Sequence, residues 1–192
     1  MMKRLALATG ILALAAPLAL AQTSIWTSDP AHSEVDFSIR HLGITNVHGH
    51  FGNVAATIVL NDADVSKSTV TATIDVTAVD TGVSMRDNDL KSAGFFDVAH
   101  FPAATFTSTS IVKNGGNLTV TGNLTLRGIT KPVVLNVDGP SATVSGMDHK
   151  SHVGFEAITT ISRSAFGVGT SYSPPILGDD VKLTIELDVA KP

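Results

Sequence analysis

The sequence contains no cysteine and few aromatic residues, and each shortage excludes a class of protein. Without cysteine the chain forms no disulfide, uses no thiolate chemistry and carries no lipid-anchored lipoprotein cysteine. Aromatic residues make up 5% of the chain although hydrophobic residues reach 43%, so the apolar content is mostly Val, Ile, Leu and Ala. This composition is typical of a protein built from strands.

The chain also lacks an excess of positive charge. Residues 1–21 resemble a cleavable secretory signal peptide, with Lys3 and Arg4 before an apolar run and a small-x-small cleavage pattern at the end. Their removal leaves 11 basic and 17 acidic residues in the mature chain, residues 22–192, and thus a net charge of −6. An acidic domain without a basic stripe argues against binding nucleic acid or docking electrostatically on anionic lipid.

A long membrane-spanning run is absent as well. The apolar run of residues 5–20 is short for a membrane span, and no other run approaches one. We therefore expect residues 22–192 to form one exported domain without stable membrane insertion. The expected location is a Gram-negative periplasm, and full secretion is equally compatible with the sequence.

Apolar and polar residues alternate with a period of two through most of the mature chain, which predicts strands with one apolar face. The clearest example is residues 118–137, where turn residues including Gly128 and Pro132 separate two alternating runs. The predicted strands are residues 33–41, 51–60, 70–76, 104–110, 118–126, 133–137, 153–161 and 181–189. Such a chain closes into a barrel or forms a two-layer sandwich.

Many inward positions of the predicted strands are small, which matters if the chain forms a barrel. An eight-stranded barrel is just wide enough to be filled by side chains or to hold one small ligand. The small inward residues are Ala56, Ala72, Ala104, Gly122 and Ala157. We therefore expect an elongated apolar cavity inside the barrel.

One segment departs from the strand pattern. Ser84 and Asp87 have the spacing of a capping box, with Ser84 as N-cap, and predict a short helix near residues 85–92. A cluster of aromatic residues follows, among them Phe95, Phe96 and Phe106. Residues 42–47 and 163–178 are expected to be loops.

Catalytic and metal sites have weak support in the sequence. His41, His48 and His50 lie close together in sequence, and His149 precedes His152 by three residues, but both groups also suit hydrogen bonding at loop ends. The chain has no HExxH spacing and no G-x-S-x-G elbow, so we expect no metal, no cofactor and no enzymatic activity.

Three cations near predicted loops have alternative interpretations. Arg163 could bind a phosphate or carboxylate at a barrel mouth, or form an ion pair with Asp87, Asp97 or Asp179 that holds the long loop in place. Arg127 and Lys131 in the hairpin turn are expected to be solvated.

An ordered series of short motifs across nearly the whole mature chain resembles the YceI-like family. The motifs are Asp29-Pro30-x-His32-Ser33, His41-Leu42-Gly43, Val47-x-Gly49-x-Phe51, Arg86-Asp87-x-x-Leu90-Lys91-Ser92, Phe95-Phe96-Asp97-Val98, Pro102-x-x-Thr105-Phe106, Gly122-x-Leu124-Thr125-Leu126-x-Gly128-x-Thr130-Lys131-Pro132-Val133, Gly154-Phe155, Arg163-Ser164-x-Phe166-Gly167 and Leu177-Gly178-Asp179-x-Val181. The resemblance implies an all-β fold, an eight-stranded antiparallel lipocalin-like barrel with one short helix. It also implies a pore for a long amphiphile, such as a polyisoprenoid, an isoprenoid quinone, a fatty acid or its amide, and a homodimer.

The expected function is binding of such a lipid for periplasmic transport, storage or sequestration. Contacts with the tail are expected from inward residues, and contacts with the head group from His41, Arg86 and Arg163. The expected tail contacts are Phe37, Ile39, Phe95, Phe106, Leu124, Leu126, Phe155, Phe166 and Ile185. The alternatives are a ligand-free structural or stress-response interaction barrel with a filled interior, and an enzyme that uses the histidines.

Overall fold

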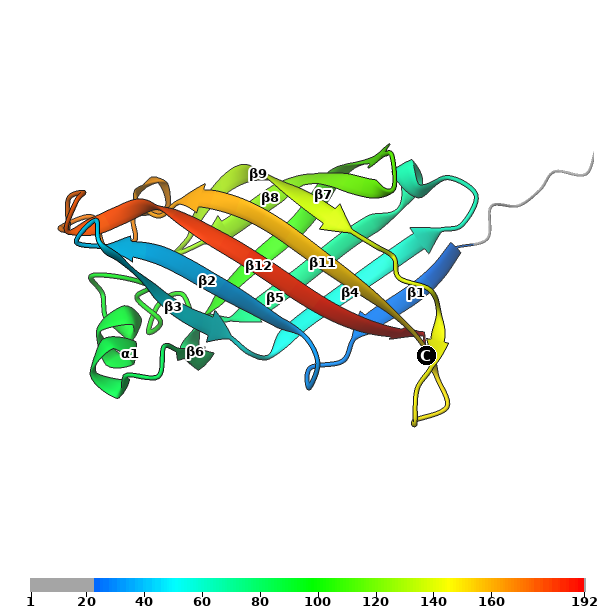
Figure 1. Ribbon diagram of the computed structural model, residues 1–192, viewed down its shortest axis with the longest axis horizontal. Helices are drawn as coiled ribbons and strands as arrows, with labels where there is room; N and C mark the ends of the chain where they lie inside the picture. The colour runs from blue at the N-terminus through cyan, green and yellow to red at the C-terminus, as the bar shows by residue number, and fades with distance from the viewer. Residues whose placement is uncertain (1–22, 192) are drawn as a thin grey trace, which may run out of the picture.

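The computed structural model describes residues 23–191 (Figure 1), so the predicted signal peptide, residues 1–21, lies outside the described residues. The strands are β1 (Thr23–Ser28), β2 (Glu34–His41), β3 (Thr45–Phe51), β4 (Val54–Asn61), β5 (Thr69–Asp75), β6 (Val79–Asp80), β7 (Ala103–Asn114), β8 (Asn117–Leu126), β9 (Ile129–Asp138), β10 (Val144–Ser145), β11 (Ser151–Ser162) and β12 (Leu177–Lys191). The helices are α1 (Ser84–Lys91) and the 3-10 turns η1 (Val65–Lys67), η2 (Val76–Ala78) and η3 (Ser164–Phe166).

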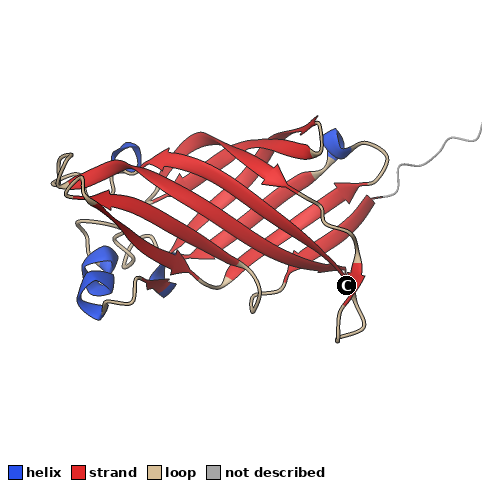
Figure 2. Ribbon diagram, in the orientation of Figure 1, coloured by secondary structure: helices blue, strands red, loops and turns tan. Residues whose placement is uncertain are grey.

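Eight of these strands form a closed antiparallel ring (Figure 2). The order is β11-β9-β8-β7-β5-β4-β1-β12, and the ring closes because β12 pairs with β1 on one side and with β11 on the other. The predicted eight-stranded antiparallel barrel with one short α-helix is therefore confirmed. Within residues 23–191, no helix has both the length and the hydropathy needed to cross a membrane.

Strand β12 pairs with two different strands along its length, with β1 toward one end of the barrel and with β2 toward the other. Both β1 and β2 are antiparallel to β12, with Ser28 opposite Val189 and Glu34 opposite Glu186, so residues 29–33 loop out between them. In the same way, β3 passes into β4 through a two-residue break at Gly52 and Asn53. The strands β2, β3 and β6 therefore extend the wall toward α1, while β1 and β4 form it at the opposite end (Figure 1).

Strand β3 begins inside a segment, residues 42–47, that the sequence predicts as a loop. The turn is limited to residues 42–44, and β3 starts at Thr45. The alternation of apolar and polar residues in β3 is interrupted in the sequence at Gly49, because this inward position has no side chain. A Cβ atom there would lie 2.5 Å from the Phe37 Cζ atom on the neighbouring strand β2, so the ring of Phe37 already occupies that space. The predicted run 51–60 correspondingly divides between β3 and β4.

Helix α1 is close to its predicted position, but the predicted cap is wrong. The N-cap is Val83, and Ser84 is already the first helical residue, with no side-chain cap hydrogen bond at this end. Asp87 instead fastens the helix to the preceding loop, since its Oδ1 accepts hydrogen bonds from Thr81 N at 2.9 Å and Thr81 Oγ1 at 2.5 Å. A carboxylate in the first turn also suits the positive end of the helix dipole.

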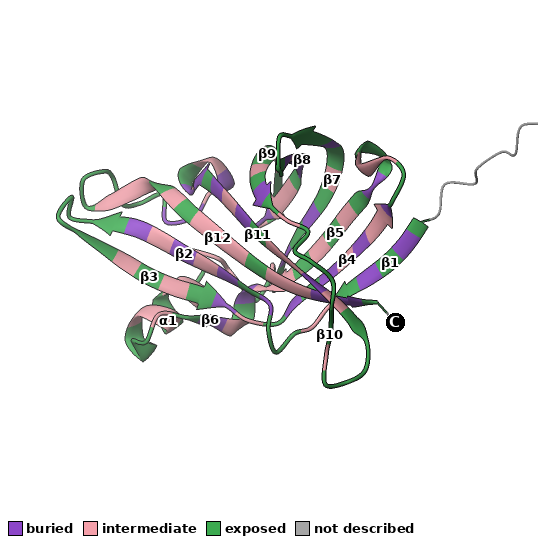
Figure 3. Cartoon of the chain, turned by 45° about the vertical axis from the view of Figure 1, so that its right-hand side comes forward, coloured by how far each residue is buried: buried purple, intermediate pink, exposed green. Residues whose placement is uncertain are grey.

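The interior of the barrel differs between its two ends. We call the end near α1, β6 and residues 163–176 the helix end, and the end near β10 and the chain termini the far end (Figure 1). Buried and exposed residues alternate along the strands (Figure 3), as the two-residue period predicts. The far end is filled by two apolar clusters, whose buried members are Phe106, Ile111, Leu118, Val120, Val137, Ala157, Trp26, Ile58, Val153 and Val189.

Candidate ligand cavity

The helix end of the barrel encloses an apolar cavity of about 360 Å³. This volume falls within the range of roughly 300–1,000 Å³ that is usual for small-molecule pockets. The lining residues are Val35, Phe37, Ile39, His41, Val47, Phe51, Ile74, Val76, Arg86, Asp89, Leu90, Phe95, Phe96, Ala104, Leu124, Leu126, Ile161, Arg163, Val168, Tyr172, Ile176, Leu177, Val181 and Leu183. Only five of these 24 residues carry a polar side-chain group, so the cavity suits a hydrocarbon chain.

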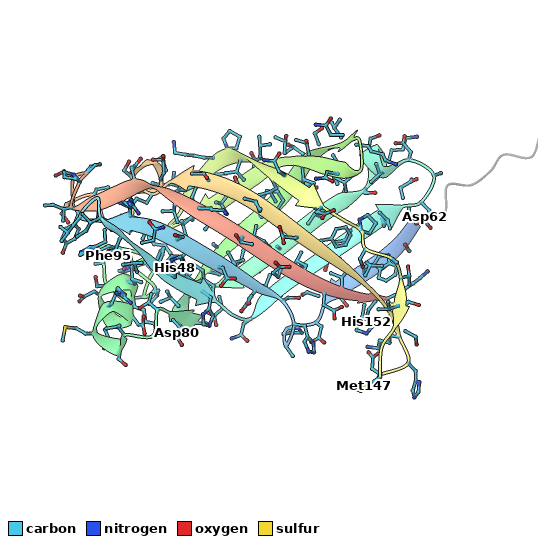
Figure 4. All side chains as sticks on the ribbon, in the orientation of Figure 1. His48, Asp62, Asp80, Phe95, Met147 and His152 are labelled. Atoms are coloured by element: carbon cyan, nitrogen blue, oxygen red, sulfur yellow. The ribbon has the colours of Figure 1, made fainter. Side chains whose placement is uncertain are left out.

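Aromatic side chains and loops close the cavity at the helix end. The ring of Phe96 packs edge-on against Phe51 with the centroids 5.5 Å apart, and Phe95 stacks on Tyr172 at 5.6 Å. Figure 4 shows Phe95 at this end, beside the loops and α1. Tyr172 and Ile176 are also partly exposed to solvent, at 45% and 48%. They therefore connect the lining of the cavity to the molecular surface.

Arg163 is a buried structural clamp. Arg163 is 4% exposed, and its five N–H groups all donate to backbone carbonyl groups, three in the loop that follows and two at the start of β12. The acceptors and their distances are Gly178 at 2.8 Å, Val168 at 2.9 Å, Gly169 at 2.6 Å, Tyr172 at 2.6 Å and Leu177 at 3.0 Å. No guanidinium N–H is left for a head group, and no described carboxylate lies within 4 Å. The predicted ion pair with Asp87, Asp97 or Asp179 is therefore wrong, although Arg163 does hold the long loop. The head-group contact of Arg163 stays a prediction.

Arg86 retains hydrogen-bonding capacity. Its Nε donates to Thr81 Oγ1 at 2.8 Å and its Nη2 to the Thr81 carbonyl at 2.9 Å, and these bonds fix the plane of the guanidinium group. Among the described residues, Nη1 has no hydrogen-bond partner, and the carboxylate of Asp89, which also lines the cavity, lies beyond 4 Å. Arg86 can therefore donate to an anion or carbonyl at the mouth.

Eight of the twelve residues proposed from the sequence line this cavity: Phe37, Ile39, His41, Arg86, Phe95, Leu124, Leu126 and Arg163. The other four lie in packed regions: Phe106, Phe155, Phe166 and Ile185. Phe106 and Phe155 belong to the filled far half, and Phe166 is 2% exposed at the turn after β11. Sequence reasoning missed Tyr172 and Ile176, since their irregular loop shows no period. It also missed Asp89 and Leu90, one turn from Arg86 on α1.

The prediction that Arg127 is solvated is wrong, because its guanidinium group binds backbone carbonyls. Its Nη1 donates to the Gly167 carbonyl and its Nη2 to the Ala93 carbonyl at 2.6 Å. These bonds tie the β8–β9 turn to the loop after α1 and to the turn after β11. Its buried Nε has no hydrogen-bond partner among the described residues. The helix end is thus held together by two arginines that bind backbone carbonyls.

The histidines lie away from the cavity, apart from His41 at the mouth. His48 and His50 are exposed on one face of β3. One group of metal-ligand type occurs in residues 23–191, formed by Asp29, His32 and Asp188, whose ligand atoms all lie within 4.8 Å of one another. Neither set of histidines considered from the sequence, His41, His48 and His50 or His149 and His152, belongs to this group.

The same region at the far end contains a network of histidine–carboxylate pairs. His152 lies 2.7 Å from Asp188 through Nδ1 and 3.1 Å from Asp148 through Nε2, and Figure 4 shows it beside the β10 hairpin. The hydrogen bonds to Asp188 and then Asp148 raise the pKa of His152 above its ordinary 6.5. His32 likewise has a raised pKa because its Nδ1 contacts Asp29 at 2.9 Å. These carboxylates therefore favour the protonated form of both histidines.

A family model described as the YceI-like domain matches residues 26–189. The chain belongs to the YceI-like family. Protein YceI of Salmonella arizonae is 38% identical to it over 161 residues, which cover 82% of this chain and 81% of that protein. Protein YceI of Salmonella paratyphi B matches with the same identity and coverage.

Solved structures of other proteins have the same YceI-like architecture. The crystal structure of the Campylobacter jejuni YceI protein has 33% identity and a TM-score of 0.71, and covers 80% of this chain and 90% of its own. Burkholderia cenocepacia BcnA has 27% identity and a TM-score of 0.74, covering 84% and 98%. A polyisoprenoid binding domain from Saccharophagus degradans, at 16% identity and a TM-score of 0.64, covers 89% and 100% and shares the fold.

Replacing Arg163 with Lys should destabilise the helix end of this YceI-like barrel. Lys keeps the positive charge but offers three donors from a single nitrogen, so several of the five carbonyls would lose their partner. We expect the free energy of unfolding to fall by about 3 kcal/mol or more, because buried unpaired polar groups cost 1–3 kcal/mol each. Denaturant unfolding measures this loss, and hydrogen exchange should show reduced protection of residues 168–177.

Arg40→Lys is the matched control, because Arg40 is exposed on β2 and makes one side-chain hydrogen bond, to Asn46. It should change the stability by less than about 0.5 kcal/mol. If Arg163→Lys were as stable as the wild type, the five carbonyls would not need the guanidinium group, and the assignment of a clamp would be wrong.

The His152 contacts predict a stability that decreases with increasing pH. The folded state raises the pKa of His152, so the stabilisation is complete below the unfolded pKa of about 6.5 and is lost as the pH rises through the higher folded value. We expect the difference in melting temperature between the wild type and His152→Gln to shrink as the pH rises from about 6 to about 9. His149→Gln is the control, since no described carboxylate lies within 4 Å of His149. A difference that does not change with pH would contradict the assignment.

Proposed function

We propose that this protein binds one long-chain amphiphile, with the tail in the cavity and the head group at the helix end. The candidate ligand classes are polyisoprenoids, isoprenoid quinones, and fatty acids or their amides. The main support is the apolar cavity of about 360 Å³ at the helix end of the barrel, since apolar clusters fill the far end. The polyisoprenoid binding domain of Saccharophagus degradans, which has the same fold, supports a lipid of this kind.

Transport, storage or sequestration outside the cytoplasm is part of the proposal. The signal-like residues 1–21 support export to the periplasm, followed by a mature chain of residues 22–192. We propose no catalytic role, because family membership and the polyisoprenoid-binding neighbour both favour a binding protein. The exposed positions of His48 and His50, outside the cavity, agree with this choice over a histidine-dependent enzyme.

The cavity also favours a carrier over a ligand-free structural barrel. A structural barrel needs only a filled core, and the clusters at the far end are of that kind. At the helix end, inward residues such as Ile74, Leu124 and Leu183 remain half-buried. Hydrophobic side chains left in contact with an open space gain further burial when an apolar chain enters.

Native mass spectrometry of freshly purified protein tests the proposal, together with added palmitic acid and farnesol as probes. We expect a 1:1 complex in the wild type and at least tenfold weaker binding in Leu183→Trp, because the larger side chain fills the cavity. Lys182→Trp is the matched control, since Lys182 is exposed on the outer face of β12 and the same substitution should leave binding intact. The same spectra report the subunit count and thus test the homodimer that the family resemblance implies.

A wild-type protein that repeatedly carries no lipid and takes up neither probe would defeat the proposal. Equal binding by Leu183→Trp and the wild type would place the ligand outside this cavity.

Arg86 is proposed to contact the ligand head group. Arg86→Gln should weaken the binding of palmitic acid about tenfold, since one hydrogen bond to a charged group contributes 1.5–3 kcal/mol. Binding of hexadecanol, which has the same chain and no charge, should change much less. Arg40→Gln is the control, because Arg40 is exposed and does not line the cavity. Isothermal titration calorimetry gives the affinities, and equal losses for acid and alcohol would contradict a role in binding the charge.

A further inference from the structure

The cavity ends part-way down the barrel at a definite layer of inward side chains. On β5, β7 and β8, the lining residues nearest the far end are Ile74, Ala104 and Leu124. The next inward residue of β7 toward the far end is Phe106, which is 7% exposed and belongs to the filled half. Something at the level of Phe106 therefore stops the cavity.

The ring of Phe106 lies over Gly122 of the neighbouring strand β8, where no side chain is present. In the sheet register, Phe106 lies opposite Ala72 on β5 and Leu124 on β8. A Cβ atom added to Gly122 would lie 2.3 Å from Phe106 Cζ and 2.4 Å from Cε2. The tip of the ring thus occupies the side-chain position that Gly122 leaves empty, one inward position beyond Leu124 toward the far end.

Two small residues make this seat possible. Ala72 beside the ring and Gly122 beneath its tip leave room for an aromatic side chain to lie across the strands, and no larger residue at Gly122 would allow it. The space around Gly122 is therefore filled by one side chain, that of Phe106. Removing that ring would open this space from the cavity side.

We propose that Phe106 is the floor of the cavity and the residue that limits how long a chain the protein accepts. The inference rests on the proposed function, since it assigns the length specificity of the same site. A chain that enters at the helix end runs down the barrel past Leu124 until it meets the ring. Longer chains then leave their remaining carbons at the mouth, where they are not enclosed.

The register indicates how far the floor would move on truncation. Successive inward residues of a strand are two positions apart, which corresponds to about 7 Å along the strand. Phe106→Ala would extend the cavity by about one such layer, or several methylene groups. Ala104→Leu would have the opposite effect, because Ala104 lines the cavity directly above the ring and a larger side chain there raises the floor.

The test measures affinity against chain length with straight-chain alkanoic acids of graded length, by calorimetry on the intact protein. In the wild type, affinity should rise with each added carbon and then level off at the length that reaches the floor. In Phe106→Ala this limit should move several carbons longer, with about a fourfold gain in affinity per methylene group beyond the wild-type limit. In Ala104→Leu it should move to shorter chains.

Phe155→Ala is the matched control. It removes the same ring from the filled half, away from the cavity lining, and should leave the length limit unchanged. Phe106→Leu is a milder second variant with an intermediate shift, for use if the alanine variant does not fold.

The outcomes distinguish the two proposals. If the wild type binds no alkanoic acid, the floor assignment is wrong. The proposed function is wrong as well only if farnesol also fails to bind and no lipid co-purifies. If the wild type shows a length limit that neither Phe106 variant moves, or that Phe155→Ala moves equally, the floor assignment fails while the cavity remains the binding site. A shift in the Phe106 variants and Ala104→Leu alone supports the floor.

Discussion

Closure of the ring by β11 and β12 is the constraint on which the rest of the structure depends. Twelve consecutive residue pairs join these two strands, from Ser151 opposite Lys191 to Ser162 opposite Asp180. A ring of eight strands has an interior just wide enough to be filled by side chains or to hold one small ligand. The size and the placement of the inward residues together decide between these outcomes. Trp26 and Phe106 belong to the buried clusters of the far half, whereas a cavity remains at the helix end although Phe37 and Phe51 line it.

The helix end has to be closed by loops, and loops bring backbone carbonyls into a partly buried region. Strands satisfy their carbonyls through the sheet, but residues 168–178 have few such partners. Arg163 supplies five donors from one planar group, which is the side chain best suited to several carbonyls at once. The carbonyl oxygens also offset the buried positive charge, which otherwise would be costly. The same logic applies to Arg127 at the β8–β9 turn.

The parts of the structure predictable from sequence are those with a regular period. Alternation located most strands, and the ordered motifs indicated the barrel and its family. Period-based reasoning failed at Gly49, where a neighbouring ring replaces the side chain, and at Arg163, where the partners are backbone atoms with no sequence signature. It also placed Phe155 among the cavity residues, because alternation shows which face a residue occupies but not its depth along the barrel. Tyr172 and Ile176 were missed for another reason, since their irregular loop has no period at all.

The cavity has an energetic cost that bears on its function. At about 24 cal/mol per Å³, an empty space of 360 Å³ costs roughly 9 kcal/mol relative to a filled core, an upper bound here because the mouth admits water. That sum is comparable with the whole stability of a typical domain, about 5–15 kcal/mol. A few larger side chains at positions such as Ala104 or Val181 would recover part of this lost stability. Since a ligand that fills the space also stabilises the folded state by mass action, the proposed binding gives a reason for the retained volume.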